Sequence, residues 1–232
     1  TAIVRIGSLT AAMTGANRQT LDASGIQYFT VHTHANQHAG YFPGAQPVHI
    51  LMHVGTDGAI LGAQAVGTDG VDRRIDVIAT AIRAGLSATD LIDLDLAYAP
   101  PYGQAKDPVN QTGMVAHNVL TGGLVLTGPD ALTEDMPVLD VRTPGEYAAG
   151  HMPNSLNIPH TQLRDRLDEV QAWADENVGD QPFVVMCAAG VRSWIGYRIV
   201  RAAGFDVTML SGGIQTLRAW LGDRAATVLL KE

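Results

Sequence analysis

The pattern of apolar residues changes near residue 122, and this change limits the possible folds more than any other feature of the sequence. Before it, apolar runs come in pairs around turn residues such as Thr56-Asp57-Gly58, which is typical of β-hairpins. After it, short apolar runs alternate with helical periodicity, as in strand–helix–strand units. The 232 residues therefore predict two domains.

The first domain is predicted over residues 1–121 as an α+β fold, in which an antiparallel sheet packs on helices. Residues 70–86 have the periodicity of a helix, with Ile75, Ile78 and Ile82 on one face and Gly85 as the stop. A second helix is expected to begin after Asp107.

A glycine-rich linker is predicted at residues 122–135, and the second domain at residues 136–232. This domain is expected to have an α/β fold, with a parallel sheet and helices on both faces. The expected strands are 137–141, 182–187 and 207–213, and the expected helices are 160–177, 192–204 and 214–221.

Composition excludes several classes of function. The formal net charge is −8 and both signs are scattered, so we expect neither a nucleic-acid partner nor a membrane surface. No apolar run approaches the roughly 20 residues that a membrane span needs. The single cysteine excludes an internal disulfide framework, and it favours a reducing, cytoplasmic setting.

That cysteine, Cys187, lies where an expected buried strand ends, before small residues and an arginine. The carboxyl end of a parallel strand is a common ligand site. A helix is expected five or six residues later, and its N-terminus together with Arg192 would favour a thiolate. We therefore predict a catalytic Cys187 and Arg192 in an active loop that also contains Ala188, Ala189, Gly190, Val191 and Ser193. The alternative is a small buried thiol without reactivity.

The loop and two flanking motifs resemble the rhodanese family of sulfurtransferases. The motifs are "LDVRTPGEYAAGHMPNSLNIP" (139–159), which includes Glu146 and Gly150, and "LSGGIQTLRAW" (210–220). The resemblance implies that Cys187 carries sulfane sulfur as a persulfide, because phosphatases of this fold have a loop longer by one residue. Asp140, Arg142 and His151 are expected to be structural. Ala188 and Ala189 replace the second basic residue of many thiosulfate-using members, which makes thiosulfate an unfavourable donor.

The first half closely resembles the dimerisation domain of FAD-dependent pyridine nucleotide–disulfide oxidoreductases, of the coenzyme A-disulfide reductase and NADH oxidase type. The segments that carry this resemblance are 38–50, 70–86 and 97–120. It implies a homodimer that acts on small thiol or persulfide substrates such as coenzyme A species. Tyr41 and Tyr98 match tyrosines at the partner subunit's reductase site, and packing at the dimer interface is the alternative. Tyr102 is assigned to packing.

The sequence contains no G-x-G segment, and its cysteine belongs to the rhodanese-like loop. We therefore expect the C-terminal part of a longer reductase, in which FAD and NAD(P)H bind to domains that precede this one. The 232-residue chain itself is expected to bind no cofactor and to lack reductase activity.

Two further hypotheses concern metals and partners. Five histidines are grouped in the first half, but they lack a paired cysteine or carboxylate set, so no metal site is predicted. They are His32, His34, His38, His49 and His53. A non-enzymatic alternative also stands, in which the chain is a dimerisation and docking module; a buried or unreactive Cys187 would favour it.

Overall fold

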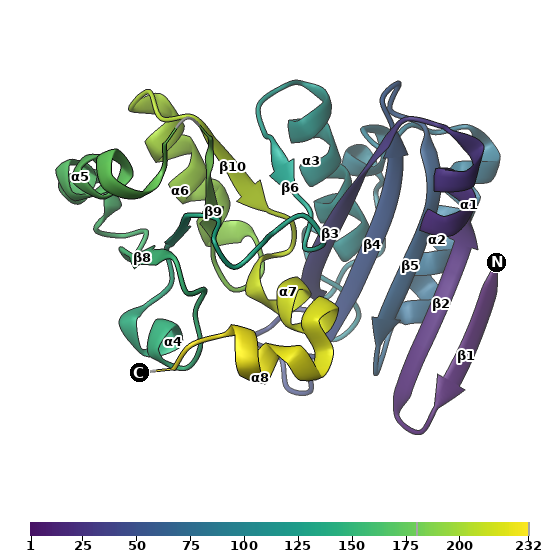
Figure 1. Ribbon diagram of the computed structural model, residues 1–232. Helices are drawn as coiled ribbons and strands as arrows, with labels where there is room; N and C mark the ends of the chain where they lie inside the picture. The colour runs from purple at the N-terminus through teal and green to yellow at the C-terminus, as the bar shows by residue number, and fades with distance from the viewer. Residues whose placement is uncertain (180, 232) are drawn as a thin grey trace. The chain divides into compact units, whose positions relative to one another are not determined.

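The computed structural model describes residues 1–179 and 181–231. The chain divides into two compact units, Thr1–Gly123 and Leu124–Glu232 (Figure 1). The strands of the first unit are coloured purple to blue, and the second unit runs from teal to yellow.

An antiparallel sheet forms the first unit, with strand order β1-β2-β5-β4-β3. The turn at Thr56-Asp57-Gly58 joins β4 to β5, as predicted, and the Gly58 N–H donates to the Gly55 carbonyl at 2.9 Å. The strands are β1 (Ala2–Ile6), β2 (Leu9–Gly15), β3 (Tyr28–Asn36), β4 (Pro47–Gly55) and β5 (Ile60–Gly67).

Two longer helices pack on this sheet. Helix α2 (Val71–Ala84) buries Ile75 and Ile78 against β5 and β2, and Gly85 ends it, as the periodicity predicts. Helix α3 (Pro108–Leu120) contacts β3 and is capped by Asp107, whose carboxylate accepts from the Val109 N–H at 3.1 Å. The short helices α1 (Arg18–Ser24) and η1 (Asp90–Asp93) complete the unit.

The second unit contains a parallel sheet with strand order β6-β10-β9-β7-β8. Its edge strand β6 (Leu126–Thr127) lies in the segment expected to be a linker and pairs with β10. The other strands are β7 (Val138–Asp140), β8 (Ser155–Asn157), β9 (Phe183–Met186) and β10 (Val207–Leu210). The helical segments are α4 (Pro144–Ala148), η2 (Leu163–Arg166), α5 (Leu167–Asn177), α6 (Val191–Ala202), α7 (Gly213–Leu221), η3 (Gly222–Arg224) and α8 (Ala225–Val228).

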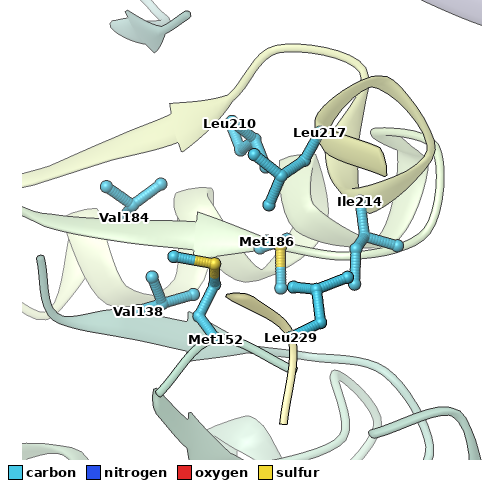
Figure 2. Packing of buried hydrophobic residues seen from close by; sticks show 8 residues of the cluster. All are labelled: Val138, Met152, Val184, Met186, Leu210, Ile214, Leu217 and Leu229. Atoms are coloured by element: carbon cyan, nitrogen blue, oxygen red, sulfur yellow. The ribbon is translucent and has the colours of Figure 1, made fainter. Parts of the chain in front are cut away.

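Strand β9 lies at the centre of the second core. Figure 2 shows Met186 on β9 surrounded by Ile214 and Leu217 of α7 and by Leu229. Side chains alternate along a strand, so Val185 points to the opposite face, where α6 covers it. The predicted α/β fold with helices on both faces is therefore confirmed, and β9 delivers Cys187 at its carboxyl end.

Within the described residues, 1–179 and 181–231, no helix has the length and apolar character needed to cross a membrane.

Candidate functional site: a cysteine loop and a tyrosine pair

Cys187 follows the last residue of β9, and α6 begins only four positions later, at Val191. The helix was expected one or two residues further on, so Arg192 and Ser193 belong to its first turn rather than to the loop before it. Gly190 lies immediately before the helix with φ of 112°, a conformation that side chains with a Cβ rarely adopt. The glycine lets the chain turn from strand to helix within a few residues.

Polar groups at the start of α6 surround the sulfur of Cys187. The Gly190 N–H donates to Sγ at 3.2 Å, and the thiol contacts the Ser193 hydroxyl at 3.4 Å. The Ser193 hydroxyl in turn donates to the Gly190 carbonyl at 2.9 Å. Free N–H groups at a helix N-terminus carry a partial positive charge. The sulfur therefore lies where a negative charge is favoured, and Ser193 can rotate to donate to a thiolate.

Cys187 itself is 2% exposed. Burial of this degree is also typical of unreactive core thiols. It is the one observation that favours the alternative of a small buried thiol without reactivity. The polar contacts distinguish this site from such a core, because an inert thiol is normally surrounded by apolar side chains.

Helix α7 holds the first residues of the loop from behind. The Ile214 N–H donates to the Cys187 carbonyl at 2.9 Å, and the Gln215 N–H donates to the Ala188 carbonyl at 3.1 Å. The approach requires Gly213, where a Cβ would lie 2.5 Å from the Cys187 carbonyl oxygen. Gly213, in the motif at residues 210–220, therefore has a steric role, since the absence of a side chain there allows α7 to reach the loop.

Arg192 forms a two-pronged ion pair with Glu146 on α4. Its two terminal nitrogens lie 2.7 Å from the two carboxylate oxygens of Glu146. These bonds, with others from Thr143, lower the pKa of Glu146 to about 2 against the opposing effect of partial burial. The Glu146 hydrogen bonds raise the pKa of Arg192, and negative charge on Cys187 adds a smaller effect in the same direction.

The three residues expected to be structural make contacts within their own segment, 140–151, that suit such a role. The Arg142 guanidinium bonds both carboxylate oxygens of Asp140 and the Gly150 carbonyl, and both side chains are buried. The His151 Nδ1–H donates to the Tyr147 carbonyl at 3.1 Å, and the ring stacks on the Tyr147 ring with the centroids 3.8 Å apart. None of these side chains has a hydrogen bond to the sulfur.

The first unit brings Tyr41 and Tyr98 together from separate loops. Their hydroxyl oxygens are 3.5 Å apart, and the side chains are exposed. The hydrogen bond to Tyr98 is the largest cause that raises the pKa of Tyr41. Tyr102 is also exposed and lies on the same loop as Tyr98, where Arg73 donates to the carbonyls of Ala97 and Tyr102.

A buried arginine organises the base of these loops. Arg74 donates to the Asp107 carboxylate at 2.7 Å and to the Gln37 carbonyl at 2.5 Å. It therefore joins the end of β3 to the cap of α3, and the two tyrosine loops leave from these points. The Ala39 N–H also donates to the Pro100 carbonyl at 3.3 Å, which links the loops directly.

The histidines of the first unit form no metal cluster. Within the described residues there is no group of three or more histidine, cysteine, aspartate or glutamate side chains that could hold a metal ion. His34 and His49 contact each other across β3 and β4, with their Nδ1 atoms 2.6 Å apart. His53 is buried, and burial lowers its pKa to about 4. His32 and His38 lie on or just after β3.

Sequence reasoning did not assign a site role to Glu146 or Gly213. Both lie in motifs that were recognised, but the motifs do not reveal which groups they contact. Glu146 is 46 residues from Arg192 in the chain, so only the fold pairs them. The Thr-Pro-Gly-Glu spacing is typical of a capping box. In the structure the Thr143 hydroxyl accepts from the Glu146 N–H, and the Glu146 carboxylate accepts from the Thr143 N–H.

Two domain families match the chain. The pyridine nucleotide-disulphide oxidoreductase dimerisation domain matches residues 1–108, and the rhodanese-like domain matches residues 129–219. The two matches fall on the separate structural units.

Three relatives have similar sequences. A crystal structure of reduced Bacillus anthracis CoADR-RHD is 39% identical with a TM-score of 0.89, covering 96% of this chain and 40% of that one. The structure of a NAD-dependent persulfide reductase from A. fulgidus is 38% identical with a TM-score of 0.83. The match covers 93% of this chain and 39% of that chain.

The third relative, coenzyme A disulfide reductase of Staphylococcus haemolyticus, is 38% identical over 120 residues, 51% of this chain and 27% of that protein. The chain thus spans less than half the length of these relatives. It combines the dimerisation domain of the pyridine nucleotide-disulphide oxidoreductase family with a rhodanese-like domain.

Proposed function

We propose that the second unit is a sulfurtransferase that carries sulfane sulfur on Cys187. The observation that supports this most directly is the Gly190 N–H, which donates to the sulfur at 3.2 Å from the start of α6. A charged sulfur is stabilised there by a group that needs no reorganisation. The Ser193 hydroxyl contacts the same sulfur, and α7 holds the loop through the carbonyls of Cys187 and Ala188.

In the proposed reaction, the Cys187 thiolate attacks the terminal sulfur of a persulfide, R–S–S⁻. The S–S bond of the donor breaks, the electron pair leaves with RS⁻, and a new S–S bond forms at Sγ. Charge and atoms balance without an oxidant. The terminal persulfide sulfur then carries the negative charge, one bond beyond the Sγ atom to which the Gly190 N–H donates.

Sulfur must leave through a second molecule. Because the chain has one cysteine, Cys187 cannot resolve its persulfide as an internal disulfide. An external thiolate, or a cysteine elsewhere in a longer protein, would attack the terminal sulfur and regenerate the Cys187 thiolate.

We further propose that the chain serves a flavin-dependent reductase of coenzyme A disulfide, polysulfide or coenzyme A-persulfide. The relatives named above support this, since two of them resemble the chain across both units. FAD and NAD(P)H would supply the hydride chemistry and bind elsewhere, because this sequence lacks any G-x-G loop. Tyr41 and Tyr98 would donate hydrogen bonds to a leaving thiolate, the chemistry available to an exposed phenol pair.

The dimerisation unit supports a homodimer. Light scattering at tens of micromolar should give twice the mass of one chain, because interfaces of obligate dimers bury a few thousand Å² and remain closed at that concentration. A monomer would contradict this assignment.

Mass spectrometry after exposure to polysulfide tests the sulfurtransferase. We expect a gain of about 32 Da, one sulfur atom, on the wild-type chain and no gain on Cys187→Ser. Ser193→Ala is a matched variant, since it removes a sulfur contact but keeps the thiol. It should load more slowly and reach the same final mass.

One observation favours a second candidate, a non-catalytic docking module. Cys187 is 2% exposed, as an inert thiol would be. If the wild-type chain gained no sulfur from polysulfide while its cysteine also resisted alkylation in the folded state, the docking module would become the better explanation.

A further inference from the structure

The charge of the cysteine loop depends on a residue outside it. Arg192 is the cation nearest to the sulfur in the loop sequence, and its guanidinium is bound at both ends by Glu146 at 2.7 Å. An arginine held in this way has one negative partner for its one positive charge. The next positions that a basic residue would occupy hold Ala188 and Ala189.

The ion pair is partly open to solvent. The Arg192 and Glu146 side chains are 26% and 38% exposed. A donor molecule that approaches the loop therefore meets both members of the pair, and its charge interacts with the carboxylate as well as with the guanidinium. The ion pair of Arg142 with Asp140 likewise joins one positive and one negative charge, and it is buried.

Donor charge matters strongly in such a loop. Attack by the thiolate on thiosulfate brings together three negative charges, two of which leave as sulfite. Attack on a monoanionic donor brings together two. Electrostatic energy scales with the product of charges, so a fixed carboxylate at the loop opposes a dianion about twice as strongly as a monoanion.

We propose that Glu146 is a specificity-determining residue, which compensates Arg192 and so selects sulfur donors of low negative charge over dianions such as thiosulfate. The inference rests on the proposed sulfurtransferase function and goes beyond it by naming the donor class: sulfane sulfur with at most one negative charge beside the reacting atom, as in an organic persulfide.

Glu146→Gln is a conservative test. Glutamine keeps an oxygen that can accept from Thr143 in the cap of α4, because capping boxes accept either residue. It removes the negative charge and, because one oxygen becomes an NH2 group, one of the two acceptors for Arg192. Glu169→Gln is the matched control, since Glu169 pairs with Arg166 on the surface of the same unit and the substitution makes the same change in net charge.

Two donors with the same sulfane group give the sharpest comparison. Thiosulfate is a dianion that releases sulfite, and methanethiosulfonate, CH₃SO₂S⁻, is a monoanion that releases methanesulfinate. In Glu146→Gln, kcat/KM should rise about tenfold for thiosulfate and about threefold for methanethiosulfonate, measured with cyanide as acceptor at low salt. Glu169→Gln should leave the ratio of the two donors unchanged.

Arg192→Gln separates a charge effect from loosening of the loop. If charge selects the donor, this variant moves the thiosulfate-to-methanethiosulfonate ratio in the opposite direction to Glu146→Gln. If both variants moved the ratio the same way, or if Glu146→Gln left it unchanged, the inference would be overturned while sulfur transfer stood. Failure of the wild-type chain to accept sulfur from either donor or from polysulfide would instead overturn the proposed function, and the inference with it.

Discussion

The tyrosine pair and the cysteine loop differ in how much of their surroundings this chain provides. Tyr41 and Tyr98 extend from two loops, exposed, with each other as hydrogen-bond partner. Cys187 is buried, with partners from α6 and with α7 behind it. The contacts of the cysteine loop therefore all come from its own unit, whereas the tyrosine pair would need a further domain or subunit to become the reductase site proposed above.

Acid should affect the two units differently, and this is the largest effect that we expect. Burial holds the pKa of His53 at about 4, below the usual 6.5, so the unfolded state binds a proton first as the pH falls. The contribution of neutral His53 to the free energy of unfolding is therefore fully present above pH 6.5. It decreases by about 3 kcal/mol as the pH falls from 6.5 to 4. Glu146, with a pKa of about 2, keeps its charge throughout that window.

The tryptophans make this measurable. All three, Trp173, Trp194 and Trp220, lie in the second unit, so their fluorescence follows that unit, while hydrogen exchange in β4 follows the first. In His53→Leu the loss of β4 protection between pH 6.5 and 4 should become smaller, and the part that remains should come from His49, whose pKa burial also lowers. Unchanged acid sensitivity in this variant would show that another group is responsible.

Arg192→Ala should slow the loading of Cys187 from polysulfide by about 10- to 100-fold, equivalent to about 1.4–2.7 kcal/mol. The loss of the guanidinium also leaves the Glu146 carboxylate unpaired at the loop. The double variant with Glu146→Gln should recover part of the rate. If the effect of the double variant on the loading barrier equalled the sum of the effects of the two single variants, the two residues would act separately.

The sequence was sufficient for the architecture because each unit has its own periodicity. Paired apolar runs predicted the antiparallel sheet, and alternation of runs with helical stretches predicted the parallel one. The strand β6 was missed, since two residues carry no periodicity and depend on β10 for their pairing. The start of α6 was placed too late because Gly190, which usually interrupts a helix, here precedes it.

Only those contacts of the candidate site that join neighbours in the chain could be predicted from the sequence. Cys187, Arg192 and Ser193 are neighbours in the chain, so their proximity followed from the motif. The pairing of Glu146 with Arg192 and the approach of Gly213 to the loop depend on how α4 and α7 pack. Such contacts between distant segments are fixed by tertiary structure and leave no mark in local composition.

Gly213→Ala tests whether the clamp by α7 keeps the cysteine loop complete. The position has φ of 64° and a Cβ there would lie 2.5 Å from the Cys187 carbonyl oxygen, so strain and a clash combine. We expect the second unit to lose about 1–3 kcal/mol and Cys187 to alkylate faster as the loop opens. Gly204→Ala is the control, since it has φ of 97° but open space around the added carbon. Equal alkylation rates in both variants would refute the clamp.

The smallest effect is expected at the tyrosine pair. Tyr41→Phe removes one hydroxyl from a 3.5 Å contact between exposed side chains, so the free energy of unfolding should change by less than about 0.5 kcal/mol. Sulfur loading on Cys187 should not change, because the two sites lie in separate units. In the reciprocal variant Tyr98→Phe, the pKa of Tyr41, followed by ultraviolet titration, should fall, since the hydrogen bond to Tyr98 is the largest cause that raises it. A large loss of stability in Tyr41→Phe would instead show that the pair is a structural contact of the first unit, and would count against its proposed role in binding a thiol substrate.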